Sequence, residues 1–192
     1  MQLCFATNNA HKLSELRQLV GNNIQLKSLS DIGCSVDIPE TGNTLRANSL
    51  EKAQYIKNHF NINCFADDTG LEVDALNGAP GVYSARYAGE PINSLNNIKL
   101  LLQNMKGVKD RKARFRTVIT LLLEDKEPVS FEGSVEGIIT LIQNGSAGFG
   151  YDPIFIPNGF SCTFAEMAAE EKNSISHRGK AVDKLINYLV NL

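Results

Sequence analysis

The chain has 192 residues, of which 43% are apolar and 21% charged, with a formal net charge of −2 at pH 7. This length suits one domain or two small lobes, and the charge excludes the broad basic surface of a nucleic-acid binder. No run approaches the roughly 18 apolar residues that span a membrane. The four cysteines are scattered without a CxxC pair, which favours a reducing compartment. We expect a single cytoplasmic domain over residues 1–192, with neither a nucleic-acid nor a membrane partner.

The first half of the chain alternates strand-like and helix-like patterns. Short apolar or alternating runs predict strands at residues 2–7, 24–29 and 63–66, the last ending at Asp67 and Asp68. Apolar residues at helical spacing predict helices over residues 13–20, closed by Gly21, and over 44–60. The segment 30–43 is rich in Gly, Pro and acidic residues and predicts an ordered loop.

The second half has more strand-like runs. These lie at residues 71–76, 113–123, 129–132 and 135–142, and a glycine-rich loop follows at 145–153. Ser94 is expected to cap a helix over residues 95–105, and an amphipathic helix is expected over 182–192. This mixture predicts an α/β fold with a mixed sheet and flanking helices, bent into two lobes.

Two polar segments follow predicted strands. Thr7–Lys12 leads from the first strand into a helix, whose unsatisfied N–H groups can bind a phosphate; the alternative, which this segment alone favours, is a plain polar helix cap. Asp67-Asp68-Thr69-Gly70 can place carboxylates where they hold magnesium or accept a proton from water, or can simply form a turn. Glu40, in the loop before the second helix, is a further candidate ligand.

Two segments near the C-terminus can recognise a nucleotide. Gly148–Pro153 contains aromatic rings flanked by glycines, which can stack on a base or fill the core. Lys172–Gly179 contains Lys172, His177 and Arg178, which can bind phosphate or carbonyl oxygens or form an exposed charged helix start.

Six segments, taken in order, resemble the motifs of the inosine triphosphate pyrophosphatase family. They are Thr7–Lys12, Glu40–Gly42, Phe65–Leu71, Gly78–Tyr87, Gly148–Pro153 and Glu171–Gly179. Each motif is weak alone, but together they span nearly the whole chain. The sequence departs from the family pattern at Asn8, where glycine is frequent, and at Ala47, where many members have an acidic residue.

This resemblance implies an elongated α/β homodimer with two lobes around a central cleft, and Mg²⁺-dependent hydrolysis of ITP, dITP and XTP to the monophosphate and pyrophosphate. By motif match, Glu40 and Asp68 would bind the metal, and Asp68 would also activate water. The residues implied to hold the triphosphate and sugar are Thr7, Asn8, Asn9, Ala10, His11, Lys12, Thr69 and Lys172. Those implied to hold the purine are Phe149, Gly150, Tyr151, Asp152, His177 and Arg178.

Two rival functions stay open at this point. One is a pyrophosphatase for modified pyrimidine nucleotides with a similar fold, against which the His177-Arg178 and Phe149–Asp152 segments count. The other is a nucleotide-binding module without catalysis, which would need no general base.

Overall fold

The computed structural model describes residues 2–20 and 24–192, so the predicted helix stop at Gly21 lies outside the described part. Within the described residues, six strands form one sheet in the order β2-β1-β3-β4-β5-β6. The strands are β1 (Gln2–Phe5), β2 (Gln25–Lys27), β3 (Cys64–Val73), β4 (Lys112–Leu122), β5 (Val129–Ile139) and β6 (Phe155–Pro157). β1 is parallel to β2 and β3, whereas β5 and β6 are antiparallel. The sheet is therefore mixed, as predicted.

Helices flank this sheet, which confirms the predicted α/β class. They are α1 (Ala10–Val20), α2 (Leu45–Phe60), α3 (Ser94–Asn104), α4 (Ala169–Ile175) and α5 (His177–Val190). None of the helices in the described residues is both long and apolar enough to cross a membrane. α2 begins as predicted, because the Thr44 hydroxyl accepts a hydrogen bond from the Ala47 amide. α3 is capped by Asn93 rather than by Ser94.

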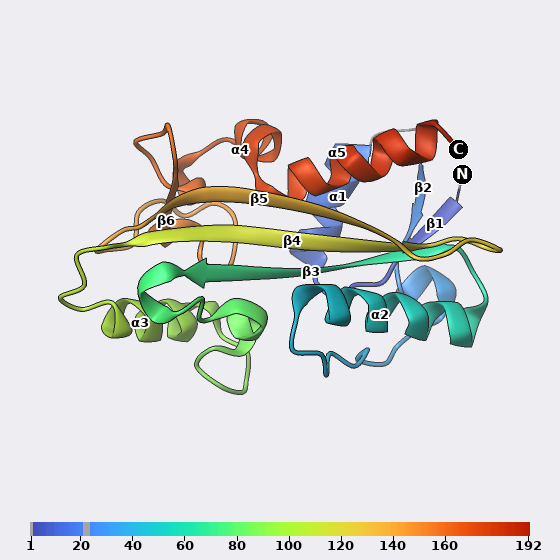
Figure 1. Ribbon diagram of the computed structural model, residues 1–192, viewed down its shortest axis with the longest axis horizontal. Coiled ribbons are helices and arrows are strands. Elements are labelled where there is room, and N and C mark those ends of the chain that lie inside the picture. Colours follow the sequence, from blue (N-terminus) through green and yellow to red (C-terminus); the bar gives the residue numbers. More distant parts are fainter. Residues whose placement is uncertain (1, 21–23) are drawn as a thin grey trace. The chain divides into compact units, whose positions relative to one another are not determined.

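One compact unit comprises the residues up to Asp68, Thr117–Gly133 and Arg178–Leu192. Successive residues of a strand point to opposite faces, so Leu3 and Phe5 pack with α1 and α5 while Cys4 packs with α2. Figure 1 shows α2 and α5 on opposite faces of the strands. The alternation in β1 and β3 thus decides which helix each strand residue meets.

The second unit comprises Thr69–Arg116 and Ser134–His177. Its apolar core joins side chains of α3 to three aromatic rings, Phe115, Phe155 and Phe164. The rings of Phe115 and Phe155 meet edge to face, with centroids 4.8 Å apart. Each buried aromatic side chain removes a large apolar area from water, and edge-to-face pairs add a further stabilisation of about 0.5–1.5 kcal/mol.

Two predicted breaks in the sheet do not exist. β3 continues from Cys64 to Val73, so Asp67 and Asp68 lie in the middle of a strand and not at its end. β5 likewise runs through Gly133, joining two predicted runs into one strand. Asp, Thr and Gly favour turns locally, but β3 is buried along nearly its whole length. Ion-pair and hydrogen-bond partners offset the free-energy cost of burying the two carboxylates, so the strand can continue through them.

Buried thiols provide a first prediction. Cys4 and Cys64 lie opposite each other in the β1–β3 pairing, and burial raises the pKa of each thiol to about 12. A thiol with that pKa carries roughly a thousandfold less thiolate at pH 8 than an unperturbed one. We expect the half-buried Cys162 to react first with a thiol reagent, and Cys4 and Cys64 only after unfolding. Mass spectrometry of the labelled native protein checks this, and early labelling of Cys4 would contradict it.

Candidate active site

Asp67 is a buried carboxylate held by cations from two helices. Its Oδ1 lies 3.0 Å from the Nζ of Lys12 on α1, and its Oδ2 lies 3.5 Å from a guanidinium nitrogen of Arg178 on α5. Arg178 also forms an ion pair with Glu15. Burial alone would raise the pKa of Asp67, but the charges of Lys12, Arg178 and Lys52 outweigh it and hold that pKa below its usual range. Asp67 is therefore a charged anchor and a poor proton acceptor.

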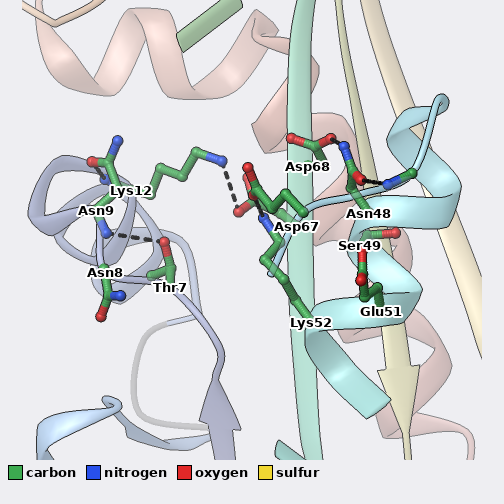
Figure 2. Close-up of polar contacts among 12 residues, drawn as sticks. Thr7, Asn8, Asn9, Lys12, Asn48, Ser49, Glu51, Lys52, Asp67 and Asp68 are labelled. Carbon is green, nitrogen blue, oxygen red and sulfur yellow. Dashed lines mark hydrogen bonds and ion pairs between the residues drawn. The ribbon is translucent and has the colours of Figure 1, made fainter. Parts of the chain in front are cut away.

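Asp68 has a different environment because it points to the other face of β3. Its Oδ2 accepts a hydrogen bond of 2.9 Å from the side-chain amide of Asn48 on α2 (Figure 2). Burial raises the pKa of Asp68, and the charges of Lys52 and Lys12 and the Asn48 hydrogen bond only partly oppose this effect. Adjacent aspartates are thereby made chemically unequal, and Asp68 is the better proton acceptor of the two.

Lys52 is a buried lysine that the motifs had not singled out. Its ammonium group forms an ion pair with Glu40. Burial lowers the pKa of Lys52, but the charges of Asp67, Glu40 and Asp68 outweigh it and raise that pKa, so the ammonium remains charged. The signal was available in the sequence: Asn48, Lys52 and Ile56 follow one another at helical spacing on the buried face of α2. A lysine on such a stripe needs an acidic partner.

The segment before α1 is ordered by its own side chains. The Asn9 side chain accepts from the Lys12 amide at 3.1 Å and so caps the helix, while the Thr7 hydroxyl accepts from the Asn9 amide at 3.2 Å. The Asn8 side chain donates to Asp37 at 3.0 Å. α1 thus begins at a polar segment held by side-chain hydrogen bonds, and Lys12 in the first helical turn extends toward Asp67 (Figure 2).

In the second unit, Asp152 and Lys172 form a buried ion pair. One Asp152 oxygen accepts from the Lys172 ammonium and from the Phe149 amide, each at 2.8 Å. A Cβ at Gly148 would lie 2.1 Å from that oxygen, so only glycine fits there. The ammonium group lies 5.0 Å from the centroid of the Phe149 ring, within range of a cation–π interaction. The pair therefore fixes the loop that presents Phe149.

Two predicted base-binding residues belong to the core of the second unit. The Tyr151 hydroxyl donates to the Ser84 carbonyl at 2.8 Å, and burial raises the pKa of that phenol. The His177 ring stacks on Phe115 with centroids 4.7 Å apart. Core filling, one of the two readings of the glycine-rich loop, therefore applies to Tyr151, and a base contact by either residue remains a prediction.

Comparison with known proteins assigns the family. Residues 3–188 match the model of the Ham1 family. The chain belongs to the Ham1 family. It is 54% identical over 189 residues to a dITP/XTP pyrophosphatase of Christiangramia forsetii, covering 98% of this chain and 99% of that protein. It is 52% identical over 190 residues to a dITP/XTP pyrophosphatase of Porphyromonas gingivalis, covering 98% and 97%. The solved Ham1 protein of Staphylococcus aureus is 37% identical, with a TM-score of 0.91 and 100% and 99% coverage.

Membership of the Ham1 family confirms the resemblance drawn from the six motifs. Within the first unit, the structure brings Glu40, Lys12 and Arg178 to the two aspartates of β3. Arg178 therefore contacts Asp67 there, whereas its sequence neighbour His177 belongs to the second unit. The remaining predicted residues lie at the start of α1 (Ala10, His11), in β3 (Thr69) and in the half-buried loop after Phe149 (Gly150).

The carboxylates of this Ham1-family chain fit a hard divalent cation. Glu40 and Asp68 are close enough that the charge of Glu40 raises the pKa of Asp68. No cluster of three or more potential metal ligands occurs among residues 2–20 and 24–192. Mg²⁺ is commonly bound by one or two carboxylates together with substrate phosphates, so this donor set matches it.

Proposed function

We propose that this chain hydrolyses the non-canonical purine nucleoside triphosphates ITP, dITP and XTP to the monophosphate and pyrophosphate. Its family and the names of its relatives support this substrate class. The observation that carries the catalytic part is Asp68, a buried carboxylate with a raised pKa beside a charged lysine. Such hydrolysis removes the nucleotides from the pool and prevents their incorporation into DNA and RNA.

The reaction requires a base, charge balance and a fixed nucleophile. Asp68 accepts a proton from the attacking water, whose oxygen forms a bond to the α-phosphorus while the bond from that phosphorus to the bridging oxygen breaks. Lys12, Lys52 and the N–H groups at the start of α1 balance the triphosphate charge. Pyrophosphate leaves, and the monophosphate carries the oxygen from water.

Glu40 and Asp68 would hold Mg²⁺. When bound, the ion neutralises phosphate charge and orients the reacting groups. Lys52 pairs with Glu40, and its charge also acts on Asp68, so it limits the repulsion between the two carboxylates.

As the motif match implies, we expect the Phe149–Asp152 loop, His177 and Arg178 to recognise the purine, and Lys172 to hold the triphosphate and sugar. Hydrogen-bond donors satisfy the carbonyl at C6 of hypoxanthine or xanthine and oppose the amine of adenine. A site that loses its hydrogen bonds with the wrong base rejects it strongly, because its own polar groups are left unpaired.

Lys172→Ala tests the role of Lys172 and of the Phe149–Asp152 loop that it supports. Losing the ammonium removes a partner of Asp152 and the cation beside Phe149, so we expect kcat/KM for dITP to fall by about 10–100-fold. Steady-state kinetics measures this effect, with Lys99→Ala on the exposed face of α3 as the control. An unchanged kcat/KM in Lys172→Ala would remove Lys172 from substrate recognition.

Product analysis tests the reaction itself. Hydrolysis of dITP in ¹⁸O-labelled water, followed by ³¹P NMR, should give pyrophosphate without label and labelled dIMP. Label in pyrophosphate, or release of orthophosphate, would place the attack at another phosphorus and contradict the proposal.

Compartment and assembly are further expectations. The four free cysteines fit a reducing cytoplasm, and the family resemblance implies a homodimer. Light scattering of the purified chain measures its mass in solution, and a monomer would contradict the second expectation.

A further inference from the structure

Three side chains of α2 bind three successive residues of the turn Glu40-Thr41-Gly42. Lys52 pairs with Glu40. The Glu51 carboxylate accepts from the Thr41 amide at 2.7 Å and from the Thr41 hydroxyl at 2.9 Å. The Asn48 side-chain oxygen accepts from the Gly42 amide at 2.8 Å. Every residue of this turn is therefore tied to the same helix, although the turn belongs to neither a helix nor a strand.

Asn48 also connects the turn to Asp68. Its amide is fully buried, with the oxygen on Gly42 and the nitrogen 2.9 Å from Asp68 Oδ2 (Figure 2). The Gly42 amide thus sets the orientation of the Asn48 side chain, and that orientation directs a donor at Asp68. A Cβ at Gly42 would lie 2.8 Å from the Asn48 oxygen and 2.6 Å from the Ala47 Cβ. The close approach explains why glycine occupies that position.

We propose that Asn48 and Glu51 are positioning residues for the reaction proposed above. They hold the turn on α2 so that the Glu40 carboxylate stays beside Lys52 and the Asp68 carboxylate keeps one orientation. An irregular segment without such bonds samples many backbone conformations, and ordering it costs free energy each time the site is assembled. Residues that orient metal-binding carboxylates typically change metal affinity or activity by about 10–100-fold when removed.

Glu51 allows the sharper test, because it contacts only the turn in the described bonds and lies outside the proposed catalytic groups. The variants are Glu51→Ala, Glu51→Gln and Asn48→Ala, with Gln54→Ala on the exposed face of the same helix as the control. For each variant, NMR measures amide hydrogen exchange at Thr41 and Gly42. Calorimetry measures Mg²⁺ binding without substrate, and steady-state assays give kcat and KM for dITP.

We expect Glu51→Ala to speed exchange at Thr41 and to weaken Mg²⁺ binding by about 10-fold or more. Glu51→Gln should recover part of both losses, since its amide oxygen can accept one of the two Thr41 bonds. Asn48→Ala should speed exchange at Gly42 and lower kcat more than it raises KM. Gln54→Ala should match the wild type in all four measurements.

The inference is overturned if exchange at Thr41 does not change in Glu51→Ala. It is also overturned if exchange rises while Mg²⁺ binding and kcat/KM stay within about twofold of the wild type, because the bond would then serve only the turn itself. A wild-type protein that hydrolyses none of the nucleotides would contradict the proposed function. Exchange and Mg²⁺ binding would still decide the roles of Asn48 and Glu51.

Discussion

Asp68→Asn is expected to lower kcat for dITP by about 10²–10⁴-fold while the protein remains folded. The asparagine amide keeps the size of the side chain but cannot accept the proton of the attacking water. Because the folded protein raises the pKa of Asp68, it disfavours the charged form, so the neutral replacement should cost little stability. Pyrophosphate release measures the first effect and thermal unfolding the second. Hydrolysis at the wild-type rate by a folded Asp68→Asn variant would exclude Asp68 as the base.

Asp67→Asn, unlike Asp68→Asn, should destabilise the folded protein. The folded protein lowers the pKa of Asp67, which means that the charged form stabilises the fold. Removing that charge leaves Lys12 and Arg178 without their shared carboxylate, and breaking a buried ion pair in this way typically costs about 3–5 kcal/mol. We expect a loss of this order in the free energy of unfolding, measured by urea denaturation followed by circular dichroism.

The pH dependence of this loss has a definite sign. A carboxyl group whose pKa is lowered by folding stabilises the folded state at pH values above its pKa in the unfolded state. This stabilisation is lost as the pH falls through its pKa in the folded state. The difference between the wild type and Asp67→Asn should therefore shrink on acidification. Asp110→Asn is the control, because Asp110 is exposed and contacts Lys112 through an ion pair of 4.0 Å and a backbone hydrogen bond that asparagine can keep, so it should change stability by no more than about 0.5 kcal/mol. A loss in Asp67→Asn as small as in this control would contradict the anchor role of Asp67.

Regular elements with strong periodicity were predictable. The helix expected over residues 44–60 is α2, because its apolar spacing and the Thr44 cap are both local features. The strand break expected at Asp67 was wrong for the same reason: the local residues favour a turn, while the partners that keep them in a strand come from α1, α2 and α5. Tertiary contacts of that kind have no signature in a short window of sequence.

The candidate site was predicted in part. The family motifs predicted that Lys12, Glu40 and Asp68 act in one site, and these residues lie in one cluster of charged side chains in the structure. Lys52 and Glu51 were missed because each lies outside the six motifs, and a lysine or glutamate on a helix is usually solvated. Only the contacts with Glu40 and Thr41 distinguish them.

The central claim is selectivity for non-canonical purines, and kcat/KM is its most direct measure. Pyrophosphate release should be followed with Mg²⁺ for dITP and XTP, and under the same conditions for dATP and dGTP. The proposed function predicts kcat/KM values for dITP and XTP at least about 10²-fold above that for dATP, since the C6 amine of adenine leaves the hydrogen-bond donors of the site unpaired. We expect a similar ratio over dGTP, which shares the C6 carbonyl, through steric or polar exclusion of its 2-amino group. Equal values for all four nucleotides, or no turnover of any by the folded protein, would contradict it.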